Sequence, residues 1–401
     1  MARERRWPVI TALGVVQILA WGSSFYLLAV LAAPIVADTG WPLPWVVGGI
    51  SIGLLIAGLV SPRVGLAIGA HGGRPVLALS AVLLALGLAL LGAAPNLPVF
   101  FAAWVLLGLG MGTGLYDAAF ATLGRLYGAS ARSAITTLTL LGGFASTVCW
   151  PLAALLVSYG GWRTACFTFA VLQLVVSLPL IWLMIPSAPP GIVPATPASG
   201  HSAALRPEER AAFLVFAAIL TVGGTVMTLL SVHLITLMQA RGLDLAAAVG
   251  LGTLIGPSQV GARVLEMAGR GRHHPLWTLS AAMSLIAVGV ILLGGGYANA
   301  AIAIALYGGG NGIYSIARGT LPLALFGPER YPALMGRLAR PALVAQALAP
   351  SLGAFAIAHW GSGVTFELLS ALALLNVALV AALWPISRRV RRARVITQAA
   401  Q

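Results

Sequence analysis

The sequence predicts an all-α membrane protein with twelve spanning helices in two pseudo-symmetric bundles of six. The first observation behind this prediction is composition: of 401 residues, 59% are hydrophobic and 8% charged, with a mean hydropathy of +0.97. A soluble chain carries about 25% charged residues. The second observation is an internal repeat with an offset close to 200 residues. Too little polar surface is present to cover a water-soluble particle, so we expect lipid to surround the chain.

The repeat is visible in three separate segments. The matching segments are Gly112-Thr-Gly-Leu-Tyr116 with Gly310-Asn-Gly-Ile-Tyr314 (offset 198), residues 22–30 with 224–232 (offset 202), and Arg63, Pro75 and Ser80 with Arg263, Pro275 and Ser280 (offset 200). Three segments with nearly one offset indicate a duplication. A duplicated hydrophobic chain is typical of secondary transporters, whose two halves move around a site between them.

Twelve stretches are apolar over about the 20 residues that a helix needs to cross the hydrocarbon core. They are continuously apolar and do not alternate with period two, which favours helices over a barrel. We expect spans at 8–33, 44–68, 75–95, 98–124, 133–159, 163–185, 211–239, 245–268, 275–296, 298–325, 336–359 and 364–386.

One long polar connection divides the twelve spans into two sets of six. Residues 187–210 are rich in Pro, Ser, Ala and Gly, which predicts a flexible cytoplasmic linker. We therefore expect an N-terminal bundle at 1–186, a C-terminal bundle at 211–387 and a basic cytoplasmic tail at 388–401.

The net charge of +14 comes from arginine, because the chain contains no lysine. These arginines lie in short loops between spans and form no basic patch on a soluble domain, so nucleic acid is excluded as a partner. With a cytoplasmic N-terminus, eighteen arginines fall inside and only Arg163 and Arg241 outside. By the positive-inside rule, both termini are expected in the cytoplasm of a bacterial-type inner membrane. We expect a monomer whose partners are the bilayer, a small-molecule substrate and protons.

The loop between the second and third spans carries a recognisable motif. It reads Gly65-Leu-Ala-Ile-Gly69-Ala70-His71-Gly72-Gly73-Arg74. With the twelve spans, the linker and the repeat, the whole chain resembles the major facilitator superfamily, whose motif is Gly-x-Leu-Ala-Asp-Arg-x-Gly-Arg-Arg. The resemblance implies a gating role for Gly65, Gly72 and Arg74. The acidic position of the motif is Gly69 here, which implies a cytoplasmic latch that is weak or differently built.

Two embedded charges are the main candidates for the transport site, because ionisable groups in lipid are costly and usually functional. Asp117 lies on the fourth span and Arg318 on the tenth. In the repeat, Arg318 aligns with Phe120, one helical turn from Asp117, so we expect both charges to point into one central space. Asp117 could take up a proton, and Arg318 could hold a substrate carboxylate with two hydrogen bonds. The alternative is a static buried ion pair.

Four further ionisable residues are candidates with a competing explanation. Arg63 and Arg263 occupy equivalent places near cytoplasmic ends of the second and eighth spans, and Glu266 follows Arg263 by one turn. They could form gating contacts; alternatively, the arginines snorkel to headgroups and Glu266 forms an i,i+3 pair. His233, on the seventh span, could relay protons or simply pack.

Polar aromatic residues extend the candidate substrate site. Gln17, Trp21 and Tyr26 lie on the first span, and Tyr116 and Tyr314 are a duplicated pair beside the charged positions. Rings with a polar tip suit small organic solutes, although ordinary helix packing would also explain them. The resemblance implies that the first, fourth, seventh and tenth spans line the cavity.

These features predict a secondary active transporter that moves a small organic solute by alternating access, coupled to protons. An organic anion such as a monocarboxylate is favoured, because Arg318 is the one central cation. The alternative is a proton-driven drug or cation efflux antiporter in which Asp117 binds the cargo; its Gly-x-x-x-Gly-Pro pattern is absent from the fifth span. A third class is a membrane-embedded enzyme or sensor. The sequence has no Walker motif, His/Cys cluster or nucleophile–base spacing, so we expect no catalytic residue, metal or cofactor.

Overall fold

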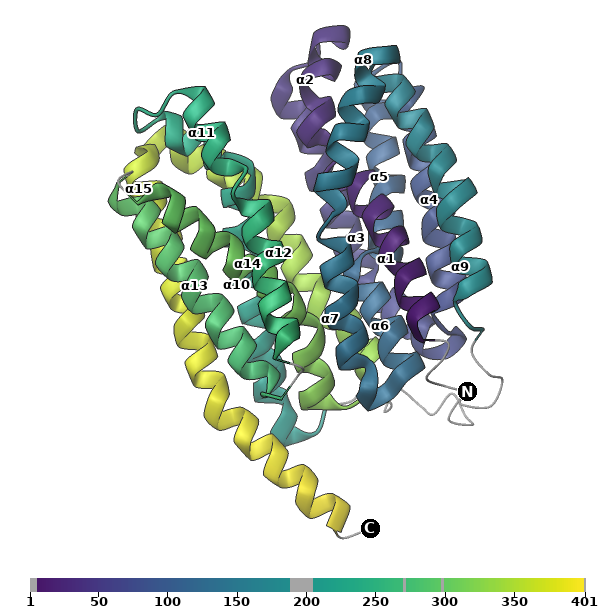
Figure 1. Cartoon of the computed structure of the whole chain (residues 1–401), viewed down its shortest axis with the longest axis vertical. Helices are drawn as coiled ribbons and strands as arrows, with labels where there is room; N and C mark the ends of the chain where they lie inside the picture. Colours follow the sequence, from purple (N-terminus) through teal and green to yellow (C-terminus); the bar gives the residue numbers. More distant parts are fainter. Residues whose placement is uncertain (1–5, 188–204, 270–271, 297–298, 400–401) are drawn as a thin grey trace. The chain divides into compact units, whose positions relative to one another are not determined.

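The computed structural model describes residues 6–187, 205–269, 272–296 and 299–399 (Figure 1). Within these ranges all regular structure is helical, which confirms the predicted class. Seven helical stretches there are long and apolar enough to cross a membrane, and two of them, Leu97–Met184 and Tyr331–Val390, have 88 and 60 residues. One crossing needs about 20 residues, so each has room for more than one. The predicted linker at 187–210 lies mostly outside the described residues.

Short turns join most of the helices, and the connection from α9 to α10 lies mostly outside the described residues. In chain order they are α1 Arg6–Gly22, α2 Leu28–Thr39, α3 Leu43–His71, α4 Gly73–Gly92, α5 Leu97–Gly114, α6 Tyr116–Tyr127, α7 Ala131–Gly142, α8 Ala145–Leu172, α9 Leu178–Met184, α10 Pro207–Gln239, α11 Leu245–Gly252, α12 Ile255–Ala268, α13 Pro275–Gly295, α14 Ala300–Phe326 and α15 Tyr331–Ala399. A 3₁₀ turn covers Gly128–Ser130, and a π-helical turn covers Gln173–Ser177.

The chain forms two compact units. Unit 1 comprises Met1–Gly200 with Pro328–Ala347, and unit 2 comprises His201–Gly327 with Leu348–Gln401. The beginning of α15 therefore packs with the first half of the chain, and the remainder of α15 packs with the second half.

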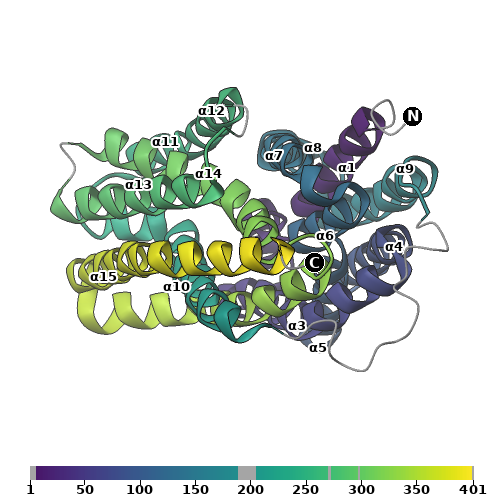
Figure 2. The ribbon, with the colours of Figure 1, turned by 90° about the horizontal axis from the view of Figure 1, so that it is seen from below.

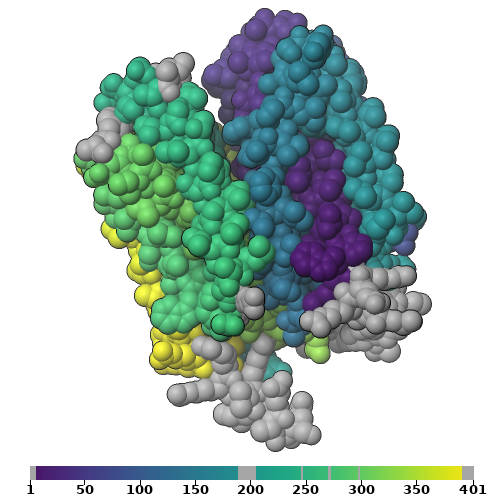
Figure 3. All heavy atoms as spheres, viewed as in Figure 1, coloured from purple at the N-terminus to yellow at the C-terminus, as the bar shows by residue number. Residues whose placement is uncertain are grey.

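In unit 1, α1 packs against α7, α8 and α9, while α5 packs against α3 and α4 (Figures 1 and 2). The core between α3, α4 and α5 contains large side chains with no exposed surface, among them Phe100 and Trp104. Figure 3 shows that one side of α1, drawn in purple, reaches the surface of this unit between teal neighbours. Trp7, which is 67% exposed, lies on α1.

In unit 2, α14 packs against α13 and α12. Glycines allow the backbones of α13 and α14 to touch. A Cβ atom on Gly289 would lie 2.7 Å from the Ala303 carbonyl oxygen, and one on Gly310 would lie 2.7 Å from the Ala282 carbonyl oxygen. Small residues that permit such close approach are a general feature of helix packing in membranes.

Large apolar side chains cover much of the outer surface of both units. Leu183 is 74% exposed, Leu214 66% and Leu265 75%. Soluble monomers rarely expose wide apolar patches, and lipid removes the cost of exposing them. The surface therefore agrees with the membrane-spanning character of the helices.

Five of the twelve predicted spans are not single α-helices: the span 163–185 contains the π-helical turn, and four others are interrupted after a glycine. The four interruptions of this second kind follow the last residues of α1, α5, α7 and α11, and each of these helices ends in glycine. The four glycines are Gly22, Gly114, Gly142 and Gly252. Glycine costs about 1 kcal/mol relative to alanine inside a helix, which makes these points the weakest in otherwise apolar helices.

The internal repeat extends to the backbone conformation of one turn. Gly161, inside α8, has φ 77° and ψ 177°. Gly361, inside α15 and 200 residues later, has φ 78° and ψ 174°. Both residues interrupt a helical segment at the junction of two predicted spans. The duplicated segments thus share a turn conformation as well as sequence.

Candidate functional site

Asp117 lies at the start of a helix. The chain leaves the helical conformation at Leu115, whose ψ is −171°, and α6 begins at Tyr116, so Asp117 belongs to the first turn of α6. The N-terminal end of a helix carries a partial positive charge that stabilises a nearby carboxylate by about 0.3–1 kcal/mol. The sequence predicted a continuous fourth span with Asp117 inside it, and therefore gave no sign of this helix start.

Gln17 connects this helix break to the aromatic residues of α1. Gln17 has no exposed surface, and its Nε2 donates a hydrogen bond to the Gly114 carbonyl oxygen at 2.7 Å. Its Oε1 accepts a hydrogen bond from Trp21 Nε1 at 3.1 Å. The amide therefore satisfies a carbonyl at the end of α5 and fixes the position of the Trp21 ring.

An aromatic cluster surrounds Trp21 in unit 1. The Trp21 ring centroid lies 5.0 Å from that of Tyr116 and 5.9 Å from that of Tyr26. Each of these three side chains is partly exposed. The cluster comprises Trp21, Phe25, Tyr26, Tyr116, Phe120 and Trp150.

The cluster contains three of the predicted site residues, namely Trp21, Tyr26 and Tyr116, and a fourth, Gln17, is hydrogen-bonded to Trp21. Sequence reasoning did not identify Phe25, Phe120 or Trp150 as members. The available signal was spacing, because Phe120 follows Tyr116 by one helical turn and its ring stacks on Tyr116 at 5.1 Å and 8°. Partly exposed rings can pack against the apolar part of an organic solute.

On α14 of unit 2, Tyr314 and Arg318 differ in exposure. Tyr314 is 6% exposed, and its hydroxyl lies 3.5 Å from the Leu220 carbonyl oxygen of α10. Arg318, one turn later, is partly exposed. It is also the only charged residue in the 27 residues of α14. Tyr314 is thus more deeply buried than its repeat partner Tyr116.

Arg263 is buried, which contradicts both the predicted snorkelling of its side chain and its predicted pair with Glu266. Its side chain is 5% exposed, and its Nε donates to the Gly312 carbonyl oxygen of α14 at 3.1 Å. Its repeat partner Arg63 is exposed, as snorkelling requires. The duplication therefore does not preserve the environment of this arginine.

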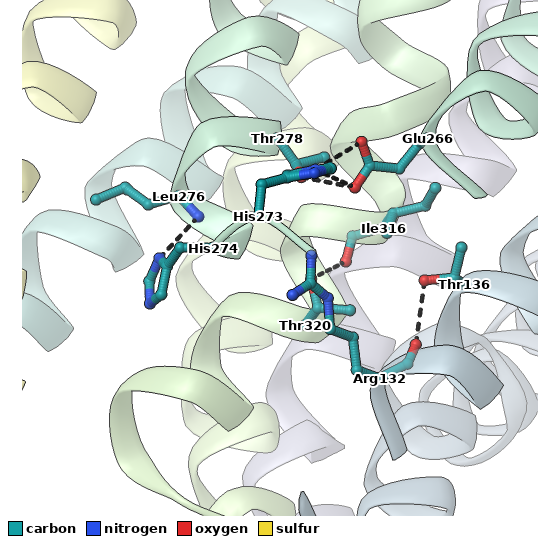
Figure 4. A network of polar contacts seen from close by, with 9 residues as sticks. All are labelled: Arg132, Thr136, Glu266, His273, His274, Leu276, Thr278, Ile316 and Thr320. Atoms are coloured by element: carbon teal, nitrogen blue, oxygen red, sulfur yellow. Dashed lines mark hydrogen bonds and ion pairs between the residues drawn. The ribbon is translucent and has the colours of Figure 1, made fainter. Parts of the chain in front are cut away.

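Glu266 instead accepts hydrogen bonds from the neighbouring loop and from α13. Its carboxylate lies 3.0 Å from His273 Nε2 and accepts a hydrogen bond from the Thr278 hydroxyl at 2.7 Å (Figure 4). The Glu266 carboxylate is therefore bound by His273 and Thr278, and not by Arg263 as the i,i+3 pair would require.

His233 has a well-defined partner in unit 2. Its Nε2 lies 2.8 Å from the Pro350 carbonyl oxygen. A carbonyl only accepts hydrogen bonds, so Nε2 carries the proton. Gly353 makes room for the ring, because a Cβ atom there would lie 2.6 Å from His233 Cδ2. This contact agrees with the packing interpretation of His233.

The predicted gating loop is held by backbone contacts. A Cβ atom on Gly65 would lie 2.4 Å from the Pro332 carbonyl oxygen, and one on Gly336 would lie 2.1 Å from the Ser61 carbonyl oxygen. The backbones of α3 and the beginning of α15 therefore touch within unit 1. Gly72 directly follows the last residue of α3 and has φ 85°, a conformation that favours glycine.

Two arginines complete this region. The Arg74 guanidinium lies over the Trp182 ring, 4.4 Å from its centroid, a cation–π contact. The Arg125 guanidinium donates to the carbonyl oxygen of Gly69. Gly69 stands where the family motif has aspartate, so a backbone carbonyl binds a cation at this position.

No candidate metal site of three His, Cys, Asp or Glu residues occurs among the described residues. The two cysteines are free and buried. Cys149 packs beside α1, with its Sγ 3.4 Å from the Ile18 carbonyl oxygen.

Comparison with known families and structures identifies one family. The model of the Major Facilitator Superfamily matches residues 13–336. A comparison with individual curated proteins gives no significant match.

Solved transporter structures share the fold over nearly their whole length. The human organic anion transporter MFSD10 (TETRAN) is 17% identical, with a TM-score of 0.74 over 94% of this chain and 99% of its own. A variant of the E. coli fucose:proton symporter FucP is 14% identical, with a TM-score of 0.68 over 95% and 98%. A double-tryptophan mutant of XylE is 14% identical, with a TM-score of 0.72 over 96% and 98%. At these identities the likeness establishes the fold.

Proposed function

Because the chain belongs to the major facilitator superfamily and is a non-enzymatic, multi-pass membrane transporter, we propose that its cargo is a small organic anion such as a monocarboxylate. Alternating access moves this anion, and protons drive the movement. The fold alone does not specify the cargo, so the proposal rests on the charged and aromatic residues.

Arg318 is the observation that carries the anion proposal. It is the only charge on α14, a helix whose residues are otherwise apolar or uncharged and mostly buried. A cation in such a helix is costly unless it serves a function. Guanidinium binds carboxylate with two parallel hydrogen bonds. The organic anion transporter named above shares the fold, which supports this substrate class.

Asp117 is the proposed proton-coupling group. It lies at the N-terminus of α6 beside the aromatic cluster, where a carboxylate can be ionised in one state and protonated in another. The fucose:proton symporter shares the fold, which supports coupling to protons. Tyr116, Trp21, Tyr26 and Gln17 then contact or orient the apolar part of the cargo.

Export of an organic cation is the second candidate function. The observation that favours it is the same cluster: an aromatic ring face attracts a cation, and Asp117 supplies the countercharge. In that case Arg318 would only modify the electrostatic potential of the site, and the cargo would bind mainly to unit 1.

Transport by proteoliposomes containing the purified protein separates these functions. We expect an inward pH gradient to drive uptake of radiolabelled benzoate or lactate, and Arg318→Gln to abolish it. Asp117→Asn should abolish gradient-driven uptake and retain exchange of internal for external anion. Arg210→Gln removes an exposed arginine at the start of α10 and serves as the control of equal charge. Uptake of an organic cation that requires Asp117 and persists in Arg318→Gln would refute the anion proposal.

The gating assignments remain part of this proposal. The α3–α15 backbone contact at Gly65 provides a latch without aspartate, with Gly72 and Arg74 holding the loop beside it. Arg63 contacts headgroups, and Glu266 binds the loop at His273. Reduced exchange in Gly65→Val without loss of benzoate binding would support this latch, whereas wild-type exchange would contradict it.

The proposed topology places both termini in the cytoplasm of a bacterial-type inner membrane, with the transporter acting as a monomer. Reporter fusions at the two ends test the orientation, and the mass of the detergent-solubilised particle tests the monomer. A reporter active only on the outer side would contradict the topology.

A further inference from the structure

The helix α12 has a single buried residue, Arg263, which is 5% exposed. The other residues of α12 are partly or fully exposed. In an amphipathic helix the buried position is normally apolar, and arginine is almost never fully buried unless it is paired. The position of Arg263 therefore requires an explanation other than packing.

Close contact between α12 and α14 traps the arginine. A Cβ atom on Gly312 would lie 2.5 Å from the Gln259 carbonyl oxygen, and one on Gly308 would lie 3.0 Å from that of Ile255. The two glycines are one turn apart, so they form a groove into which the backbone of α12 fits. Arg263 follows Gln259 by one turn and is held against α14.

The contacts of Arg263 leave part of its guanidinium unused. Its Nε donates to the Gly312 carbonyl oxygen, which also accepts the Ser315 hydroxyl at 2.7 Å. Its Nη1 is buried and has no hydrogen-bond partner among the residues that the structure describes. Glu266, the acidic residue one turn away, is occupied by His273 and Thr278. A buried cation without a countercharge is strongly unfavourable.

We infer that Arg263 is a second anion-binding residue of unit 2, and that its guanidinium binds the carboxylate of a small organic anion. The inference rests on the proposed function for its substrate class and assigns substrate binding to a residue that the repeat identifies only as a gating candidate. A carboxylate supplies both the missing charge and the acceptor for Nη1. A soluble anion is favoured over a lipid headgroup, because the side chain is only 5% exposed.

Thermal unfolding of the full chain in neutral detergent tests the inference. Sodium benzoate, lactate and succinate are titrated at ionic strength matched with sodium chloride. We expect at least one of them to stabilise the wild type and Arg210→Gln equally. In Arg263→Gln its apparent Kd should rise by about tenfold or more, the effect of losing one charge-assisted hydrogen bond. Arg263→Lys keeps the charge without the planar fork and should give an intermediate Kd.

The outcomes separate this inference from the proposed function. If a carboxylate binds to Arg263→Gln as to wild type and fails to bind to Arg318→Gln, the anion cargo stands and the role of Arg263 is refuted. If no carboxylate stabilises the wild type, both are refuted. If phosphatidylglycerol stabilises the wild type through Arg263 and carboxylates do not, the site binds lipid and the inference fails.

A chemical footprint covers the case in which Arg263→Gln does not fold. Phenylglyoxal modifies guanidinium groups, and mass spectrometry of the wild-type peptides measures the rate at each arginine. The stabilising carboxylate should slow modification of Arg263 and leave Arg210 unchanged. Equal rates at Arg263 with and without the carboxylate would overturn the inference.

Discussion

Replacing Gly312 by alanine tests the contact on which the environment of Arg263 depends. The added methyl carbon would lie 2.5 Å from the Gln259 carbonyl oxygen and 2.8 Å from its Cα, whereas ordinary contacts begin at 3.4 Å. Both opposing atoms belong to backbone and cannot rotate away. The helix α12 must therefore move from α14 by about 0.9 Å at this point. Overpacking of this kind costs about 1–3 kcal/mol.

The same displacement weakens a hydrogen bond. The distance from Arg263 Nε to the Gly312 carbonyl oxygen is 3.1 Å, and an added 0.9 Å takes it beyond hydrogen-bonding range. Loss of a bond from a charged donor costs about 1.5–3 kcal/mol. Alanine returns about 1 kcal/mol through its higher helix propensity. The net expectation is a loss of about 1.5–5 kcal/mol in the free energy of unfolding.

Gly261→Ala, on the facing helix α12, is the matched control. A Cβ atom on Gly261 would meet nothing within 4 Å, so this variant should gain up to about 1 kcal/mol. Intrinsic tryptophan fluorescence during thermal unfolding in detergent measures both variants against the wild type. A Gly312→Ala protein that melts at or above the wild-type temperature, as Gly261→Ala should, would refute the backbone contact between α12 and α14.

Three further predictions concern unit 1. Gly336→Ala should lower the melting temperature, because its methyl group would lie 2.1 Å from the Ser61 carbonyl oxygen. Gly69→Ala places its methyl group in open space and should leave the melting temperature unchanged. Equal melting temperatures of the two variants would contradict the α3–α15 contact. Hydrogen bonds from neighbouring Arg163 and Trp162 lower the pKa of Asp38 below its usual value near 3.8. The ionised Asp38 therefore stabilises the fold above pH 3.8, and this stabilisation is lost as the pH falls through the lowered pKa. The difference in melting temperature between wild type and Asp38→Asn should shrink on acidification. A difference that stays constant with pH would show that ionised Asp38 does not cause it. Cys149 and Cys166 are 1% and 0% exposed and should react with maleimide only on unfolding, as followed by mass spectrometry; rapid labelling of the folded protein would show that they are accessible.

The helical class and the family were predictable because they depend on composition, repeat and a motif that are properties of the sequence itself. The interruptions were not, since glycine alone does not determine them. Gly114 ends α5, whereas Gly308 and Gly310 lie within an unbroken α14. The difference depends on what the neighbouring helix provides, such as the side chain of Gln17, which accommodates the carbonyl of Gly114.

In the candidate site, too, some contacts were predictable from the sequence and others were not. Tyr116, Trp21 and Gln17 were predicted together from their places on the first and fourth spans, and the structure brings them into contact. Arg263 was assigned the environment of Arg63 because the two are repeat partners. Its burial depends on the groove formed by Gly312, which is a property of a packed pair of helices and is absent from local sequence.

The twin turns at Gly161 and Gly361 have a consequence for the history of the chain. A Cβ atom at either position would meet nothing within 4 Å, yet both residues hold φ near 77°, where any L side chain is strained. The positive φ alone, without steric contact from neighbouring residues, thus makes any substitution of these two glycines unfavourable. Since the ancestral duplication, the preceding residues have diverged to Tyr159 and His359. The two glycines therefore give a structural reference point for aligning one half of the chain with the other.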